Sequence, residues 1–398
     1  MSTSIEQKLD LMELERFSIS SLNLFRTNRI SWYLRYILNF KSVYPMQSAW
    51  RGQAIEGAIN NYIDKARAGK TSDENELIDY AIHDYQSRIL TSLFKIYPKT
   101  LDGFDLDKMV ILLKGKSKDE FPSILKTIVE GHFTINKSLE VLPEFLIPES
   151  EEYFKFLKKS EKQYDLIIEA TSGLYEYFKT LPIEEVRKQG KISANNYDIP
   201  IPTIGYFDYE FPDFGIDLKS CDPVTFPKKW DDVSLSYKCQ SAFYSKTLKK
   251  PWKIVYGSRL SKDSKKENEI LSIFKSGIPL DKIAQVFKEK TGSGTTKPTI
   301  EKILNNTLQG TTIDNWDPKK PIAIFDLPEN EIEHYDNINK FTAKSILMAI
   351  ESSRKNSLEE DMKYFCLSDT EHMFISPDEA EIIKKTYGFT IPTELTEE

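Results

Sequence analysis

Apolar residues recur at helical spacing through much of the first 181 residues. Two sets show the period best: Ile30, Tyr33, Leu34, Ile37 and Leu38, and then Leu77, Ile78, Ala81, Ile82 and Tyr85. A period of three to four residues is typical of amphipathic helices. The pattern continues over residues 151–181 and stops at Pro182, since proline has no amide hydrogen for a helix. Residues 1–181 are therefore predicted to form a mostly helical N-terminal region.

The pattern changes to one typical of strands in residues 182–260. Residues 199–211 are rich in β-branched and aromatic side chains, and Pro-Asp-Phe-Gly at 212–215 is a turn signal. Apolar and charged residues then alternate, which places Asp217 and Lys219 on one face of an extended segment. Together these segments predict a β-hairpin.

The rest of the chain adds a helix, two strands and a helical insertion. A helix is predicted over 234–248 and a strand over 252–256, so strand, strand, helix, strand indicates an α/β core at 182–260. Residues 261–318 are predicted to be a helical insertion, either an ordinary helical hairpin or a helix-turn-helix that contacts DNA or a protein. Residues 319–398 are predicted to return to the core with a strand at 322–325 and C-terminal helices.

Composition and charge narrow the possible classes of protein. The 398 residues carry a formal net charge of −7, and 40% of them are apolar. No apolar run is long enough to span a bilayer, and the first residues show no signal pattern, so a cytoplasmic location without membrane contact is expected. The charge argues against a sequence-independent DNA coat, which is normally basic. The negative net charge does not exclude a nuclease, because only the DNA-binding groove of a nuclease needs to be positive.

Three cysteines, Cys221, Cys239 and Cys366, are too few and too widely spaced for an iron–sulfur cluster or a zinc site. Chemistry is therefore expected to use carboxylates and metals that prefer oxygen ligands. Arginine is concentrated near the start of the chain, where Arg16, Arg26, Arg29, Arg35 and Arg51 fall within 51 residues. These arginines fit either phosphate contacts or a solvated helical face.

Asp208, Asp217 and Lys219 are the candidate chemical centre. Asp-x-Lys also occurs at 263–265, 317–319 and 361–363, but none of these copies lies in an apolar extended context. Two carboxylates from neighbouring strands can hold Mg²⁺, and a lysine near the activated water can orient it or help to remove its proton.

Three further positions complete this expectation. The carbonyl of Leu218 can point into the same space as the carboxylates. Gln240 and Tyr244 lie one helical turn apart on one face of the following helix, where they can position the lysine or bind the strand being cut.

The order of these motifs resembles that of the PD-(D/E)XK nuclease superfamily, in the branch of RecB-type and Cas4-type exonucleases. That branch carries an arginine-glycine helix motif, then G-x-x-D, D/E-x-K and Q-x-x-x-Y. The matching positions here are Arg51-Gly52 with Glu56, Gly205 to Asp208, Asp217 to Lys219, and Gln240 to Tyr244. The segment that begins at Phe17 is similar to the family's opening, so the resemblance spans roughly residues 17–256.

The resemblance implies a restriction-endonuclease-like α/β core, with a mixed central sheet flanked by helices, and a role for each matching residue. Glu56, Asp208, Asp217 and the Leu218 carbonyl would bind Mg²⁺ or Mn²⁺. Lys219, Gln240 and Tyr244 would act in catalysis with the two aspartates, and Arg51 would contact a DNA phosphate or cap a helix. No iron–sulfur cluster is expected, because its four cysteines are missing.

These observations predict a metal-dependent deoxyribonuclease, an exonuclease rather than an endonuclease, acting in recombination, repair or phage DNA processing. Three alternatives stay open at this point. One is a catalytically silent DNA-binding relative, one is a restriction-type endonuclease that reads sequence through the insertion, and one is a helical scaffold with accidental motif matches.

Overall fold

The structure, a computed structural model, describes residues 15–38, 47–96, 150–195, 197–260, 262–308 and 322–353, with the single residues 120, 123 and 384. Cys366 and the predicted C-terminal helices beyond residue 353 lie outside these ranges, apart from residue 384. Among the described residues, no helix combines the length and the apolar character needed to cross a membrane.

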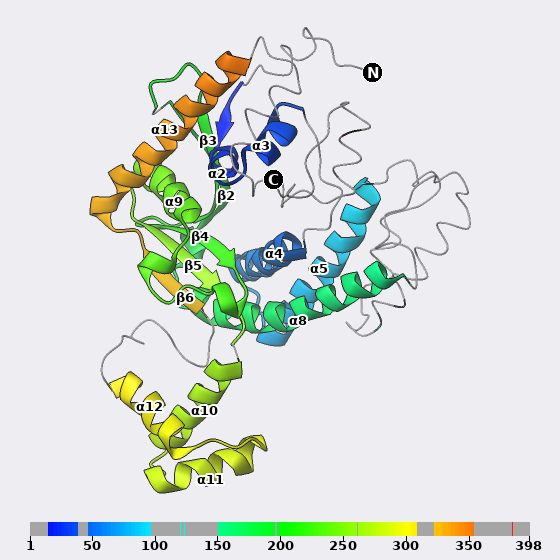
Figure 1. Ribbon diagram of the computed structural model, residues 1–398, viewed down its shortest axis with the longest axis vertical. Helices are drawn as coiled ribbons and strands as arrows, with labels where there is room; N and C mark the ends of the chain where they lie inside the picture. The colour runs from blue at the N-terminus through cyan, green and yellow to red at the C-terminus, as the bar shows by residue number, and fades with distance from the viewer. Residues whose placement is uncertain are drawn as a thin grey trace, which may run out of the picture.

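A six-stranded mixed sheet lies at the centre of the molecule (Figure 1). Its strands are β1 (Phe17–Ser18), β2 (Arg187–Ala194), β3 (Thr203–Glu210), β4 (Gly215–Ser220), β5 (Trp252–Gly257) and β6 (Ile322–Asp326). The main path runs β1-β3-β4-β5-β6, and β2 pairs with β3 beside this path. The β4–β5 and β1–β3 pairs are parallel and the other pairs are antiparallel. The predicted mixed α/β architecture is confirmed at this level.

β3 and β4 form the predicted hairpin, with one feature that the sequence did not indicate. Phe211 donates its amide hydrogen to the carbonyl of Phe214 at 2.8 Å, which closes the turn. Only the two residue pairs next to the turn, Tyr209 with Ile216 and Glu210 with Gly215, are in register. Main-chain pairing therefore stops before Asp208, and side chains carry the remaining contact between the two strands.

Helices cover both faces of the sheet. On one face, α4 (Gln47–Arg67), α5 (Glu74–Ile96) and α8 (Glu151–Phe178) share a buried cluster with Tyr209, Ile216 and Val255 of the sheet. The other face packs against α2 (Ile19–Thr27), α3 (Arg29–Tyr36), α9 (Leu235–Leu248) and α13 (Glu329–Ser353). The apolar stripe of each helix is thereby removed from water, which is the main stabilising term in such a layered fold.

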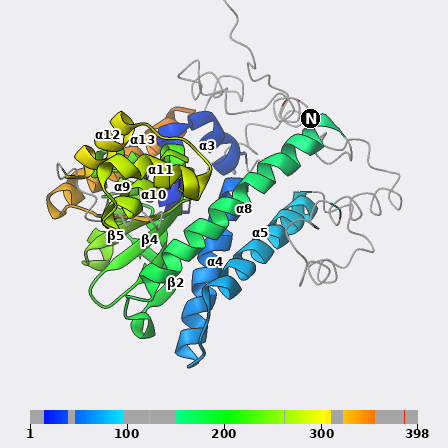
Figure 2. The ribbon, with the colours of Figure 1, turned by 90° about the horizontal axis from the view of Figure 1, so that it is seen from below.

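Three helices between β5 and β6 form a unit with its own core. They are α10 (Lys262–Lys275), α11 (Leu280–Thr291) and α12 (Lys297–Leu308), and Figure 1 shows them at one end of the molecule, away from the sheet. Their apolar side chains, among them Ile270, Ile283, Phe287 and Ile300, pack on one another. Figure 2, the view from below, shows the same unit in front of the sheet. We call residues 262–308 the helical unit.

Candidate active site

Asp208, Asp217 and Lys219 meet where β3 and β4 separate. Asp208 replaces the missing main-chain pairing, because its Oδ2 accepts a 2.6 Å hydrogen bond from the amide of Leu218. Lys219 Nζ lies 2.6 Å from Asp217 Oδ2. We call these three residues the carboxylate site. The sequence predicted that they would be close, and the structure brings them together.

Asp217 is an unusual side chain because it is charged, buried and poorly satisfied. It is 0% exposed, and neither of its carboxylate oxygens accepts a hydrogen bond of good geometry from the described residues. The contact with Lys219 is therefore an ion pair by distance alone. A fully buried carboxylate costs stability even when one ammonium group faces it, so its retention in a core is typical of a functional group.

Burial and neighbouring charges shift the pKa values of all three groups. Burial raises the pKa of Asp208 well above its ordinary value, and the neighbouring Asp217 raises it further. Burial also raises the pKa of Asp217, although Lys219 opposes the shift. Burial lowers the pKa of Lys219, but the attraction of Asp217 and Asp208 outweighs it, so the net pKa is above the ordinary value. Lys219 is thus an ammonium group that can neutralise negative charge.

The donor set of the carboxylate site fits a hard divalent cation. Mg²⁺ is usually held by one or two carboxylates, with water and substrate oxygens in the other positions. Asp208 and Asp217 supply two, and a cation would relieve the burial cost of both. No group of three or more His, Cys, Asp or Glu side chains close enough to hold a metal ion occurs among the described residues. Glu56 is therefore not in a common ligand set with the two aspartates here.

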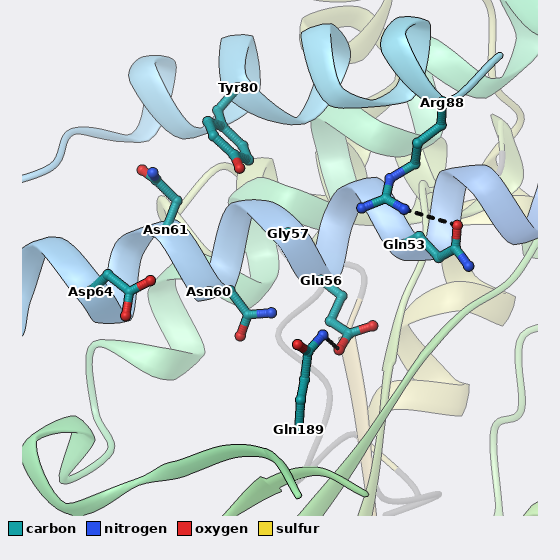
Figure 3. Close-up of a pocket in the computed structure, with 9 residues that line it drawn as sticks. All are labelled: Gln53, Glu56, Gly57, Asn60, Asn61, Asp64, Tyr80, Arg88 and Gln189. Atoms are coloured by element: carbon teal, nitrogen blue, oxygen red, sulfur yellow. Dashed lines mark hydrogen bonds between the residues drawn. The ribbon is translucent and has the colours of Figure 1, made fainter. Parts of the chain in front are cut away.

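Glu56 instead lies on α4 at the edge of the carboxylate site. Its Oε1 accepts a 2.8 Å hydrogen bond from Gln189 Nε2 of β2, as Figure 3 shows. It is still near enough for its negative charge to raise the pKa of Asp208. Glu56 therefore acts electrostatically on Asp208, while its hydrogen bond ties it to β2. Its role as a metal ligand, like that of the Leu218 carbonyl, stays a prediction.

Gln240 and Tyr244 hold the strand that carries Asp208. Tyr244 donates its hydroxyl hydrogen to the carbonyl of Tyr206 at 2.5 Å, and Gln240 Nε2 donates to the Tyr244 hydroxyl at 2.9 Å. A Cβ on Gly205 would lie 2.5 Å from the Tyr244 ring, so glycine is needed there for α9 to pack directly on β3. These bonds fix the strand, and their role in positioning the lysine stays a prediction.

Tyr237 is a site residue that the sequence motifs did not identify. It lies in the first turn of α9, and Lys219 Nζ lies 4.9 Å from the centre of its ring. A cation over an aromatic face is attracted by the ring quadrupole. The spacing of 237, 240 and 244 places all three on one side of the helix, and this period was the only signal available in the sequence.

Arg51 is buried and bonded to partners within the chain. It is 3% exposed, and its guanidinium donates to the Ser220 hydroxyl at 3.2 Å, the Ser220 carbonyl at 3.1 Å and Gln163 Oε1 at 2.7 Å. Gly52 brings α4 close to the same serine, since a Cβ there would lie 3.2 Å from Ser220 Oγ. The arginine-glycine pair therefore fixes the end of β4 against α4 and α8. These donors are engaged within the fold, and a contact of Arg51 with a DNA phosphate stays a prediction.

The carboxylate site can bind a hard cation and place an ammonium group beside it. Glu56 adds negative charge at its edge, and α9 holds its strands in place. Comparison of the chain with protein-family models, with curated proteins and with solved structures found no match.

Proposed function

We propose that this protein is a Mg²⁺- or Mn²⁺-dependent DNA nuclease of the PD-(D/E)XK type, in the RecB-like branch, and more specifically an exonuclease. The observation that carries the proposal is the fully buried Asp217, which lies beside a second carboxylate, Asp208, with a single ammonium group, Lys219, to offset both charges. A fold keeps such a costly arrangement when a ligand completes it. The order of the motifs around it agrees with this assignment.

Each residue of the carboxylate site has a distinct task in phosphodiester hydrolysis. A divalent cation, when bound, lowers the pKa of a water molecule and polarises a phosphoryl oxygen. Asp208 and Asp217 would hold that cation, since both are hard oxygen donors. Lys219 would neutralise charge that develops on the phosphate, which suits an ammonium group. Tyr237, beneath the ammonium group, would keep it in place.

The helical unit is proposed as a second contact with DNA. Residues 262–308 hold nine lysines against six acidic residues, a net charge of +3, whereas the whole chain carries −7. Gly292, with a φ of 68°, caps the end of α11, and a short turn leads to α12 as in a helix-turn-helix. A positive unit attracts the DNA backbone, while the acidic remainder of the chain does not.

The decisive experiment is digestion of end-labelled linear DNA and closed circular DNA with Mg²⁺ or Mn²⁺. The wild type is compared with Lys219→Ala and with the control Lys179→Ala, which alters an exposed lysine outside the helical unit that pairs with Glu176 at 3.0 Å. We expect linear-only digestion that Lys219→Ala abolishes and Lys179→Ala retains.

The other outcomes separate the competing functions. Equal cutting of circles would replace the exonuclease with an endonuclease of restriction type. If the folded wild type cuts neither substrate with either cation but binds DNA, the protein is a silent DNA-binding relative. If it neither cuts nor binds DNA, the nucleic-acid assignment itself is wrong.

A further inference from the structure

A polar cleft lies beside the carboxylate site, between α4, α5 and β2. Its volume is about 400 Å³, which falls in the range of roughly 300–1,000 Å³ found for small-molecule sites. Figure 3 shows the lining residues, which are Gln53, Glu56, Gly57, Asn60, Asn61, Asp64, Tyr80, Arg88 and Gln189. We call it the amide cleft, because four of its nine lining residues carry a side-chain amide.

The charged groups in the amide cleft are already engaged. Arg88 donates to Asp84 Oδ2 at 2.8 Å and to Gln53 Oε1 at 3.0 Å. Asp64 forms an ion pair with Lys188, and Glu56 accepts from Gln189. No lysine or histidine is among the lining residues. A phosphate would therefore meet two carboxylates and an arginine that is already paired, so the cleft does not suit an anion.

The remaining groups suit a neutral, flat ligand with hydrogen-bonding edges. The side-chain amide of Asn61 can offer both donors and an acceptor, and those of Gln53 and Asn60 can offer donors. Tyr80, on α5, is 41% exposed and adds an aromatic ring to the cleft wall. Aromatic rings stack on nucleobases, and amide or carboxylate side chains bond to base edges.

Gln189 connects the amide cleft to the carboxylate site. Its neighbours Lys188 and Gly190 pair with Tyr209 and Phe207, so Gln189 lies opposite Asp208 in the β2–β3 register. Its φ of 49° is in the left-handed region, which is uncommon for a residue with a side chain. Such strain persists where the surrounding structure imposes it, and it occurs often at functional sites. Here it accompanies a side chain that reaches Glu56 in the cleft wall.

We propose that the amide cleft binds an unstacked nucleobase of the DNA strand whose phosphate lies at the carboxylate site. The proposal rests on the proposed nuclease function and adds the feature that the enzyme holds its substrate by a base as well as by a phosphate. Tyr80 stacks on that base, and the amides of Asn60 and Asn61 bond to its edge. A strand with an unstacked base is single-stranded at that position, so single-stranded ends are the preferred substrate.

The first test scans a single abasic residue along an end-labelled single strand. We expect one abasic position near the cleaved bond to slow cleavage by the wild type about tenfold, in line with the stacking energy of one base. Tyr80→Ala should lose a similar factor on the intact strand and lose little more on the abasic strand. Phe341→Ala removes an aromatic side chain that is 69% exposed on α13, and it should behave as the wild type does.

The second test measures binding without cleavage, by fluorescence anisotropy of a labelled oligonucleotide in EDTA. The intact oligonucleotide should bind about tenfold more tightly than one in which every base is missing, and Tyr80→Ala and Asn61→Ala should each reduce this ratio. Deoxyadenosine and thymidine should compete at millimolar concentration, whereas deoxyribose 5-phosphate should not.

The two tests keep the two proposals apart. Normal metal-dependent cleavage with equal rates at every abasic position, and equal binding of intact and abasic strands, would overturn the base site and leave the nuclease. Base-dependent binding through Tyr80 without any cleavage would overturn the nuclease and leave the base site. Competition by deoxyribose 5-phosphate alone would assign the cleft to the sugar-phosphate backbone and contradict the proposal.

Discussion

The carboxylate site and the helical unit both gather charge, but they do so under opposite physical conditions. Asp217 is fully buried, and its oxygens find no well-aligned hydrogen-bond donor among the described residues. The lysines of the helical unit include exposed groups such as Lys288 and Lys297, which remain in water. Buried charge costs free energy and exposed charge costs almost none. The buried charge of Asp217 therefore indicates a function strongly. The exposed lysines of the helical unit indicate one only through their combined positive charge.

The largest effect is expected from Asp217→Asn. Loss of one cation ligand should lower Mg²⁺-dependent cleavage by roughly 10³-fold or more, a magnitude typical for groups that stabilise a transition state. The same change removes a buried negative charge, so the variant without metal should melt at a temperature no lower than that of the wild type. Calorimetry with and without Mg²⁺ checks this, since the cation should raise the melting temperature of the wild type alone. A variant that still responds to Mg²⁺ would contradict the site.

The response to Mg²⁺ is expected to depend on pH. The pKa values of Asp208 and Asp217 are raised in the folded chain, so the folded state holds their protons more tightly than the unfolded state. Their contribution to stability is thus largest below the unfolded pKa, near 3.8, and is lost as pH rises through the folded values. Mg²⁺ binds the ionised pair, so it should raise the melting temperature by about 5 °C or more at pH 8 and less at pH 5. An equal shift at both pH values would contradict this account.

Glycine-to-alanine substitutions should destabilise the region of the carboxylate site more than the helical unit, because the first is packed more tightly around its glycine. A Cβ at Gly205 would lie 2.5 Å from the Tyr244 ring and 2.9 Å from the Phe243 ring, so Gly205→Ala should destabilise the fold by about 1–3 kcal/mol. In the helical unit, a Cβ added at Gly294 would meet no atom within 4 Å. Gly294→Ala should change the free energy of unfolding by less than about 0.5 kcal/mol. Urea unfolding measures both, and equal effects would show that α9 does not pack tightly on β3.

The smallest effects are expected from single charges of the helical unit. Lys288→Glu or Lys302→Glu should leave the melting temperature nearly unchanged and weaken DNA binding a few-fold. Each lysine that contacts a phosphate should also reduce the slope of log affinity against log salt by about 1. Lys179→Glu, on an exposed position after α8, is the matched control. If all three variants bind alike, the helical unit does not contact DNA.

Strong local patterns made much of the fold predictable. The long apolar period predicted α8, and the strand signals followed by Pro-Asp-Phe-Gly predicted the hairpin of β3 and β4. β2 was missed, because Arg187, Lys188 and Lys191 give it the composition of a loop. It forms a strand because it pairs with β3 along its length. A partner strand can override a weak local preference, and a sequence does not name that partner.

In the candidate site, too, some residues could be identified from the sequence and others could not. Asp208, Asp217 and Lys219 could be found because two short motifs flank one turn. Gln189 and Tyr237 could not, since Gln189 reaches Glu56 across 133 positions of sequence and Tyr237 contacts Lys219 from another element. The burial of Arg51 could not be found for a related reason, because burial depends on packing and cannot be read from residue type.

The helical unit is inserted at a point of the sheet where it could be replaced without disturbing the strands. β5 and β6 are antiparallel neighbours, and Gly257, the last residue of β5, pairs with Ile322, the first of β6. The insertion therefore leaves and rejoins the sheet at one point, as the loop of a hairpin does. Because the unit has its own core, it could be exchanged for another module or for a short turn without altering strand order. The helical unit and the sheet could then evolve separately.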